Sequence, residues 1–324
     1  MKKVSILVPI YGVEKYIEQC VRSLFEQTYA DIEYVFVDDC TKDRSVEILS
    51  MVTAAYPERK PMVKLIRHEH NQGLGAARRT ACMAATGDYI MHVDSDDFLP
   101  TTAVATLMAE AERSQADIVD GAYAEWRGNV AGRRHVCGDP ILPPHISKER
   151  YVRQLLCQNI ISNRVWGRLY RRALLEEFHI DYIEGINYSE DYCWVTRAMF
   201  HATRSVTDAL VYYYRMDNVS SYTHVVSEKN LLSYFKACQL VASFYEREDK
   251  QGRYRRAVDI GMVSAYRSAS EHDFDLSRVD AICTYQVKDP ICRLCIWMLR
   301  KGVKVKTVNY LYLAYRKIMT SSFF

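Results

Sequence analysis

The chain has 324 residues, of which 49% are hydrophobic and 26% are charged, and its formal net charge is +3. This length suits one large domain or two smaller ones, and the composition is that of a globular protein with a sizeable core. A net charge this small gives no reason to expect a nucleic acid partner.

The first hundred residues alternate between strand and helix patterns. Strands are predicted at Val4–Ile10, Glu33–Asp38, Val63–Arg67 and Tyr89–Val93, with helices at Glu14–Gln27, from Asp43 or Ser45 to about Tyr56, and at Gly73–Thr86. This order predicts an α/β fold with a mostly parallel sheet that is flanked by helices.

Beyond residue 100 the patterns are less regular. We predict a helix at Thr101–Ser114, a strand near Ile118–Trp126, a long loop or irregular hairpin at Gly128–Pro144, helices near Lys148–Gln158 and Asp191–His201, and a Tyr-rich strand at Val206–Tyr214. From Ser227 onward every pattern is helical. We therefore expect two domains, at residues 1–225 and 226–324.

Three carboxylates stand together in the segment HVDSDDFLP, at Asp94, Asp96 and Asp97. Mutual repulsion and desolvation make such a cluster costly in a folded chain. Either solvation at a loop tip or a bound divalent cation would offset that cost. Ligands bind at the carboxyl ends of strands in parallel sheets, and this cluster follows a predicted buried strand. The position therefore favours the cation.

The ten cysteines are scattered, and the apolar strand that follows Met1-Lys2-Lys3 is too short for a secretory signal. Cys292 and Cys295 have neither a second Cys pair nor a histidine at zinc-ligand spacing. We expect reduced thiols, no structural zinc and a cytoplasmic location.

The region from 290 to 324 has seven Lys or Arg residues and no Asp or Glu, interleaved with large apolar side chains. This composition suits peripheral binding to an anionic membrane surface, such as the cytoplasmic face of the inner membrane. A helix that packs its apolar side on the core explains the same periodicity equally well.

Five ordered blocks resemble glycosyltransferase family 2. They are VSILVPIYGVEKYI, YVFVDDCTKDRSVEIL, NQGLGAARRTACMAATGDYIMHVDSDD, VWGRLYRR and SEDYCWV. The resemblance is dense over residues 4–100 and sparser to about 224. It implies the GT-A fold, a nucleotide-sugar donor, inversion at the anomeric carbon, and a bacterial role in cell-surface polysaccharide synthesis.

The resemblance also implies which residues bind the donor. Pro9 and Tyr11 would lie beside the uracil, and Asp39 would accept the N–H of its ring, which cytosine lacks. Residues implied to meet the ribose, the diphosphate or the metal are Glu14, Asn71, Gly73, Arg78, Asp94, Ser95 and Asp96. Asp96 and Asp94 would hold Mn²⁺ or Mg²⁺, and His224 is a third candidate ligand.

An inverting transfer needs a general base that deprotonates the acceptor hydroxyl. The resemblance implies Asp191 for this role, with Glu190 beside it. Both acids also suit the first turn of a helix, where the helix dipole favours negative charge. Capping and catalysis are compatible, because the same dipole keeps a carboxylate ionised.

We therefore expect a metal-dependent glycosyltransferase that moves a sugar from a UDP-sugar to a glycan or glycolipid acceptor. Two alternatives stay open. A sugar-nucleotide-forming nucleotidyltransferase would use a similar fold, although the segment after the first strand lacks the expected Gly-rich basic loop. A non-catalytic scaffold would keep the fold without turnover.

Overall fold

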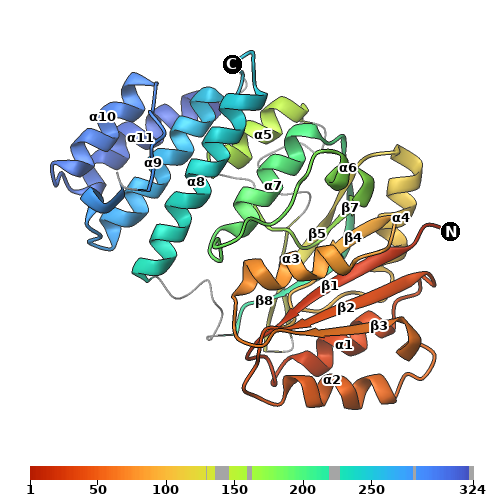
Figure 1. The fold of residues 1–324 in the computed structure, drawn as a ribbon. Helices are drawn as coiled ribbons and strands as arrows, with labels where there is room; N and C mark the ends of the chain where they lie inside the picture. Colours follow the sequence, from red (N-terminus) through yellow and green to blue (C-terminus); the bar gives the residue numbers. More distant parts are fainter. Residues whose placement is uncertain (129, 136–145, 159–162, 219–226, 280–281, 321–324) are drawn as a thin grey trace. The chain divides into compact units, whose positions relative to one another are not determined.

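The computed structural model describes residues 1–128, 130–135, 146–158, 163–218, 227–279 and 282–320 (Figure 1). It forms two compact units that interleave along the chain. The first comprises Met1–Pro144, Arg164–Gly185 and His201–Tyr222, and the second comprises His145–Asn163, Ile186–Phe200 and Thr223–Phe324. The division into domains near residue 225 stays a prediction.

Within the described residues, eight strands of the first unit form one sheet. They are β1 (Val4–Ile10), β2 (Ile32–Asp38), β3 (Val63–Arg67), β4 (Tyr89–His92), β5 (Ile118–Arg127), β6 (Val130–His135), β7 (Arg168–Arg171) and β8 (Arg204–Arg215). The order is β3-β2-β1-β4-β7-β5-β6, and β8 pairs with β5. The pairs of β1 with β2, β1 with β4, β2 with β3 and β5 with β8 are parallel, so the predicted fold class is confirmed.

Helices cover both faces of the parallel strands, as Figure 1 shows for α1 and α2 on one face and α3 on the other. The helices of this unit are α1 (Ile17–Phe25), α2 (Ser45–Ala54), α3 (Leu74–Ala84), α4 (Ala103–Ser114) and α6 (Arg172–Glu177). In α1, Ile17, Cys20, Val21 and Leu24 recur at helical spacing and are all fully buried. They join the alternating side chains of β1 in one core.

The second unit is helical. It contains α5 (Lys148–Leu156), most of α7 (Glu190–His201), α8 (Glu228–Glu248), α9 (Arg255–Glu271), α10 (Pro290–Arg300) and α11 (Val305–Thr320). Helix α9 packs against α5, α8, α10 and α11, so it is the centre of the unit. The helical prediction for the C-terminal region is confirmed. No helix in the described ranges is long and apolar enough to span a membrane.

Two further features describe the sheet, and only the first of them was not predicted. Strand β7 lies between β4 and β5 and is antiparallel to both, so the sheet is mixed. Strands β5 and β6 form a hairpin at Gly128, which has a φ of +48°. The hairpin was one of two alternatives for this region, and residues 136–144 of it lie outside the described residues.

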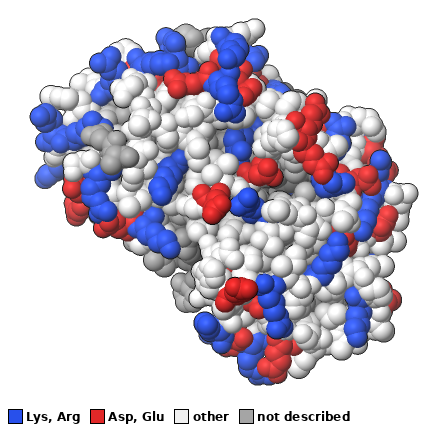
Figure 2. Space-filling model, in the orientation of Figure 1, with Lys and Arg blue, Asp and Glu red and all other residues white. Residues whose placement is uncertain are grey.

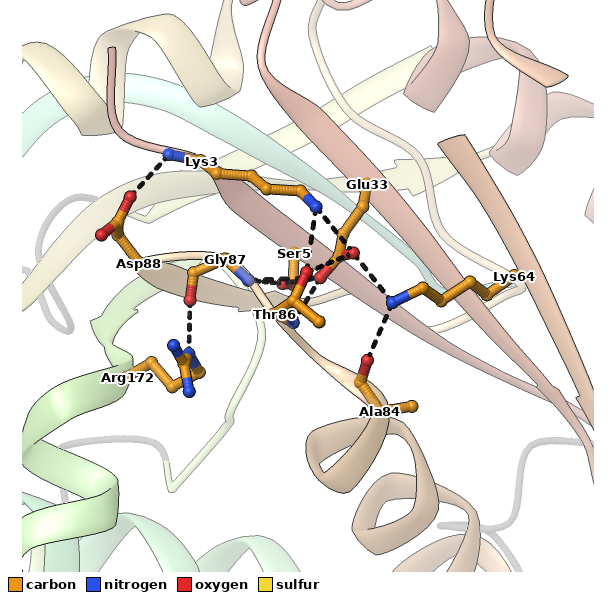
Figure 3. Close-up of polar contacts among 9 residues, drawn as sticks. All are labelled: Lys3, Ser5, Glu33, Lys64, Ala84, Thr86, Gly87, Asp88 and Arg172. Atoms are coloured by element: carbon orange, nitrogen blue, oxygen red, sulfur yellow. Dashed lines mark hydrogen bonds and ion pairs between the residues drawn. The ribbon is translucent and has the colours of Figure 1, made fainter. Parts of the chain in front are cut away.

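The buried carboxylate of Glu33 ties the amino ends of the parallel strands together (Figure 3). Its side chain is only 3% exposed. Its donors are Ser5 Oγ, the Thr86 N–H and Oγ1, the Gly87 N–H, Lys3 Nζ at 3.0 Å and Lys64 Nζ at 3.1 Å. Burial opposes ionisation, but these donors outweigh it and hold the pKa of Glu33 well below its usual value.

Glycine is required at position 87 for this arrangement. A Cβ atom there would lie 2.7 Å from Ser5 Oγ and 2.8 Å from the carbonyl oxygen of Lys3, which is closer than real Cβ contacts. The turn before β4 can therefore approach β1 only without a side chain at this position.

We predict that Glu33→Gln lowers the free energy of unfolding by about 3 kcal/mol near pH 7, because it leaves buried donors and two lysines without their anion. The folded-state pKa is depressed, so this stabilisation is present above the unfolded value of about 4.3 and is lost as the pH falls through the folded value. Urea denaturation of both proteins should therefore show a difference that narrows below about pH 4.3. Glu47→Gln, which removes an exposed carboxylate, is the control and should change little.

Candidate active site

The carboxyl ends of β1, β2 and β4 lie at one edge of the sheet, because these strands are parallel and adjacent. After β1 the chain turns at Gly12, which has a φ of +69° and donates its N–H to Thr41 Oγ1 at 2.9 Å. Pro9 is buried within β1, whereas the Tyr11 side chain is 53% exposed. Of these two predicted base-binding residues, only Tyr11 presents its ring to solvent.

Glu14 links the loop after β1 to the start of α2. Its backbone N–H donates to Asp43 Oδ2 at 2.9 Å, and its carboxylate accepts the N–H of Arg44 at 3.0 Å. This reciprocal arrangement fixes the loop that carries Tyr11. The implied place of Glu14 near the ribose or the metal stays a prediction.

Asp39 is the acceptor on which the next loop is built. Its carboxylate accepts the N–H groups of Gln72 and Gly73, each at 2.8 Å, and bonds His68 Nδ1 at 2.7 Å. An ionised carboxylate has about four acceptor positions, so three donors leave room for one more. Asp38 instead accepts the N–H of Thr41 at 2.8 Å.

The segment before α3 is therefore held by Asp39. The Asn71 side chain donates to the carbonyl oxygen of Asp39 at 3.4 Å, and Gly73 precedes α3 with a φ of +94°. A positive φ of this kind favours glycine. Both residues support Asp39 directly in this structure, and their predicted place under a diphosphate stays a prediction.

The acidic loop after β4 receives an internal cation. Arg78, from the first half of α3, is 4% exposed and donates to Asp94 Oδ1 at 2.7 Å. Arg78 was expected to face a diphosphate, so this ion pair with a predicted ribose or metal ligand is new. It brings the loop before α3 and the acidic loop into one cluster.

Strand β8 and the residues just after it supply further partners of the acidic loop. The Tyr212 hydroxyl donates to Asp97 Oδ2 at 2.7 Å and accepts the N–H of Asp94 at 3.1 Å. The N–H of Arg215 donates to Asp97 Oδ1 at 2.7 Å, and Asn218 Nδ2 donates to Asp96 Oδ2 at 2.7 Å. The loop is thus fastened by residues more than a hundred positions away.

The sequence did not identify Tyr212, Arg215 and Asn218 as partners of the acidic loop. The Tyr-rich strand was predicted, yet its period shows only which residues alternate between faces. A pairing between Asp97 and Tyr212 follows from the parallel placement of β8 beside β5, which the sequence did not reveal.

The carboxylates repel one another. Burial, and then the charge of Asp94, raise the pKa of Asp96, while burial and the charges of Asp96 and Asp94 raise the pKa of Asp97 well above its usual value. A divalent cation would relieve this repulsion, and the donors offered by Asp94 and Asp96 are all oxygens, as Mg²⁺ and Mn²⁺ prefer. Ser95 lies between them and is buried.

No cluster of three or more His, Cys, Asp or Glu suited to a metal occurs in the described part of the chain. Such a cluster is not required, because Mg²⁺ is commonly held by one or two carboxylates together with substrate phosphates. The acidic pair therefore fits a cation that arrives with its substrate. His224, the third candidate ligand, lies outside the described residues.

Glu190 and Asp191 begin α7, in the second compact unit. The segment before them is held by Ser233 of α8, whose hydroxyl accepts the N–H groups of Asn187 and Tyr188 at 3.3 and 3.1 Å. Asp191 accepts the N–H of Tyr192 at 2.7 Å, and Glu190 is buried. The predicted helix start is confirmed, and the catalytic role of both acids stays a prediction.

Trp166 is part of the core and not an exposed platform for a sugar. It is 9% exposed and stacks on Tyr212 and Tyr214, with ring centroids 4.4 and 5.0 Å apart. It therefore supports the strand that holds the acidic loop.

The sequence model of glycosyl transferase family 2 matches residues 5–178, which is more than half of the chain. The chain belongs to glycosyltransferase family 2. It is 32% identical over 267 residues to the uncharacterized glycosyltransferase EpsJ of Bacillus subtilis, covering 79% of this chain and 74% of EpsJ. It is 30% identical over 219 residues to the poly(ribitol-phosphate) β-N-acetylglucosaminyltransferase TarS of Staphylococcus aureus, covering 66% of this chain and 35% of TarS.

Solved structures agree with this fold. The crystal structure of residues 1–349 of S. aureus TarS has a TM-score of 0.67 at 20% identity, covering 97% of this chain and 91% of that one. A mannosyltransferase from Pyrobaculum calidifontis, solved with GDP-Man and Mn²⁺, has a TM-score of 0.55 at 13% identity, covering 97% and 87%. This glycosyltransferase therefore has the GT-A fold that its motifs implied.

Proposed function

We propose that this glycosyltransferase uses a divalent cation to move a sugar from a UDP-sugar to a hydroxyl of a growing, lipid-linked glycan, with inversion. The observation that carries the proposal is the cluster at the carboxyl edge of the sheet. There, Asp39 and the Asp94–Asp97 loop are connected through α3 and Arg78. TarS has been solved with UDP-GlcNAc and with UDP, which supports a uridine donor.

The uridine would be recognised by Tyr11 and Asp39. The exposed ring of Tyr11 offers a surface on which a base can stack, with its hydroxyl still in water. Asp39 has about one acceptor position left for the uracil N3–H. Because its other positions are taken by the loop before α3, base recognition and the position of that loop are coupled.

The leaving group would be accommodated by the acidic loop. Asp96 and Asp94 would hold the cation, which supplies positive charge as the diphosphate departs. Arg78 compensates the charge of Asp94, and Asn218 holds one oxygen of Asp96, so both carboxylates are fixed before a donor binds.

The acceptor proton would go to Asp191, with Glu190 in support. The start of α7 favours an ionised carboxylate there, because the dipole of the helix is positive at its N-terminus. Relatives in this family are named for transfer to poly(ribitol-phosphate), which supports a cell-surface polymer as the acceptor.

We also propose that α10 and α11 bind an anionic membrane surface. Lys and Arg side chains lie over this part of the molecule in Figure 2, in the orientation of Figure 1. Trp297 is 56% and Tyr310 is 83% exposed, at helical spacing from the exposed Leu294 and Leu313. Leu299 and Tyr312 are buried, because the other face of each helix packs within its own unit.

We predict that UDP is released from one or more UDP-sugars in a panel only when Mn²⁺ or Mg²⁺ is present. Asp96→Asn should weaken metal-dependent UDP binding at least about tenfold, since it removes a charged ligand. Calorimetry with and without Mn²⁺ measures this. Asp39→Ala should instead weaken uridine nucleotides while keeping the metal requirement.

Different results would support the alternatives to the proposed function. Unchanged metal-dependent UDP affinity of Asp96→Asn would overturn the metal assignment. Diphosphate release from UTP and a sugar phosphate would point to a nucleotidyltransferase, and no turnover of any donor would point to a scaffold.

A second prediction concerns the base. Asp191→Asn should lower the transfer rate by roughly 10²–10⁴-fold and spare UDP binding, because a general base acts only in the transfer step. The amide keeps an oxygen to accept the N–H of Tyr192, so stability should change little. Asp275→Asn, at an exposed carboxylate that also accepts a backbone N–H, is the control. Near-normal transfer by folded Asp191→Asn would reject this assignment and leave Glu190 to be tested.

The membrane proposal predicts flotation with anionic vesicles but not with neutral ones. Lys301→Gln with Lys304→Gln should reduce partitioning about tenfold or more, because each cation contributes about 1 kcal/mol near such a surface. Point variants are needed here, since truncation at 290 would expose the side chains that Leu299 and Tyr312 cover. The control is the double variant Lys229→Gln with Lys236→Gln, which removes two positive charges from α8 instead of from the proposed membrane-binding helices. Equal losses in the two double variants, or no flotation of the wild type, would contradict the proposal.

A further inference from the structure

The second unit contains a cavity of about 350 Å³ whose polar lining is cationic. Its lining residues come from α5, from the start of α9 and from the end of α11. They are Arg153, Cys157, Gly252, Arg253, Arg255, Arg256, Ala257, Ile260 and Met319. Four of the nine are arginines and none is acidic. The volume lies in the range of small-molecule sites, about 300–1,000 Å³.

The carboxylates behind this lining neutralise only part of its charge. Arg153 pairs with Glu149 at 2.5 Å, whereas Arg253 and Asp249 are 3.7 Å apart, and Arg256 and Asp289 are 3.9 Å apart. The last two distances are too long for direct hydrogen bonds. Arg255 forms no ion pair with any carboxylate of the described ranges.

The titratable groups nearby respond to a positive field. Burial, and then the charge of Arg253, lower the pKa of Lys148 at the start of α5. Burial raises the pKa of Cys157 to about 12, while Arg316 and Arg153 act in the opposite direction. A cationic neighbour produces both of these charge effects.

The position of the arginines at the start of α9 is electrostatically unfavourable. Negative charge stabilises the N-terminus of a helix, yet the first turn of α9 has no acid and begins with Arg255 and Arg256. Tyr254, the residue before α9, provides no side-chain cap. An anion in the cavity would offset both the helix dipole and the repulsion among the arginines.

The floor of the cavity is apolar. Ala257 and Ile260, one turn apart on α9, are buried there together with Cys157, the residue after α5. A cationic rim over such a floor fits a phosphate group that carries an apolar substituent. A neighbouring hollow that also contains Arg255 is different, because Glu246 and Asp249 line it.

We infer that this cavity is a second ligand site of the enzyme, which binds a phosphate or diphosphate group separately from the sugar donor. The arginines would donate charge-assisted hydrogen bonds to its oxygens, as guanidinium groups do to phosphate. The phosphate could belong to a soluble compound or to the headgroup of a prenyl lipid. This inference does not depend on the proposed donor or acceptor.

Calorimetry with inorganic pyrophosphate and with farnesyl monophosphate tests the site, in a chelator so that no divalent cation assists the donor site. Wild-type protein should bind at a ratio of one to one. Arg255→Glu should weaken binding about ten- to a hundredfold, which is the effect expected for a lost charge-assisted contact. Arg256→Gln should act in the same direction. Tighter binding of farnesyl phosphate than of pyrophosphate would assign a lipid headgroup, and the reverse would assign a soluble phosphate.

Two controls separate this inference from the proposed function. Lys236→Glu reverses one exposed charge on α8, away from the cavity lining, and should keep binding unchanged. Asp96→Asn should also keep it, since the donor site is elsewhere. The circular dichroism spectrum and the urea midpoint of Arg255→Glu should be close to those of the wild type, which shows that the variant is folded. Absence of binding by the wild type, or equal binding by wild type and Arg255→Glu, would overturn the inference.

Discussion

Asp97 is 1% exposed and lies beside two other acids, so its ionised form is costly unless strong donors meet it. The Tyr212 hydroxyl and the N–H of Arg215 are those donors. Both belong to β8, whose position depends on its parallel pairing with β5. The conformation of the acidic loop therefore depends on the pairing of β8 with β5.

This dependence explains the aromatic packing around β8. Trp166 stacks on Tyr212 and so restricts the ring whose hydroxyl reaches Asp97. Arg215 also donates to the carbonyl oxygen of Asp96 at 2.8 Å and lies over the ring of Tyr16. The backbone of the two candidate metal ligands is thus held by Tyr212 and Arg215, which pack in an aromatic layer, and a functional site requires such support.

The sequence predicted those parts of the fold that depend on local pattern. Strands β1 to β4 and helices α1 to α3 have apolar periods that define their own buried faces, and all were found within a few residues of their predicted ends. Strand β7 was missed because its four residues are too short to show a period. The grouping of α5 and α7 with the C-terminal helices was also missed, because an apolar helix face does not specify its partner.

For the candidate site, the sequence identified the acids but not their partners. Asp94 and Asp96 were expected there from their place after a strand, and Asp39 from the family resemblance. The ion pair of Arg78 with Asp94, and the bond of Asn218 to Asp96, join positions whose proximity only the three-dimensional fold determines. The family resemblance implied a different partner for Arg78, and a guanidinium suits a diphosphate as well as a carboxylate.

The two buried carboxylates at opposite edges of the sheet show how the same physics can serve stability or function. Burial disfavours the ionised form of both Glu33 and Asp97. At the amino edge, donors from five residues surround Glu33, and its pKa is lowered, so the group stabilises the fold. At the carboxyl edge, Asp97 has two donors and two acidic neighbours, and its pKa rises. The negative charge of Glu33 is therefore compensated at the amino ends of the strands. At the carboxyl ends, the acids of the loop are only partly compensated, and a cation and a nucleotide diphosphate would bind there.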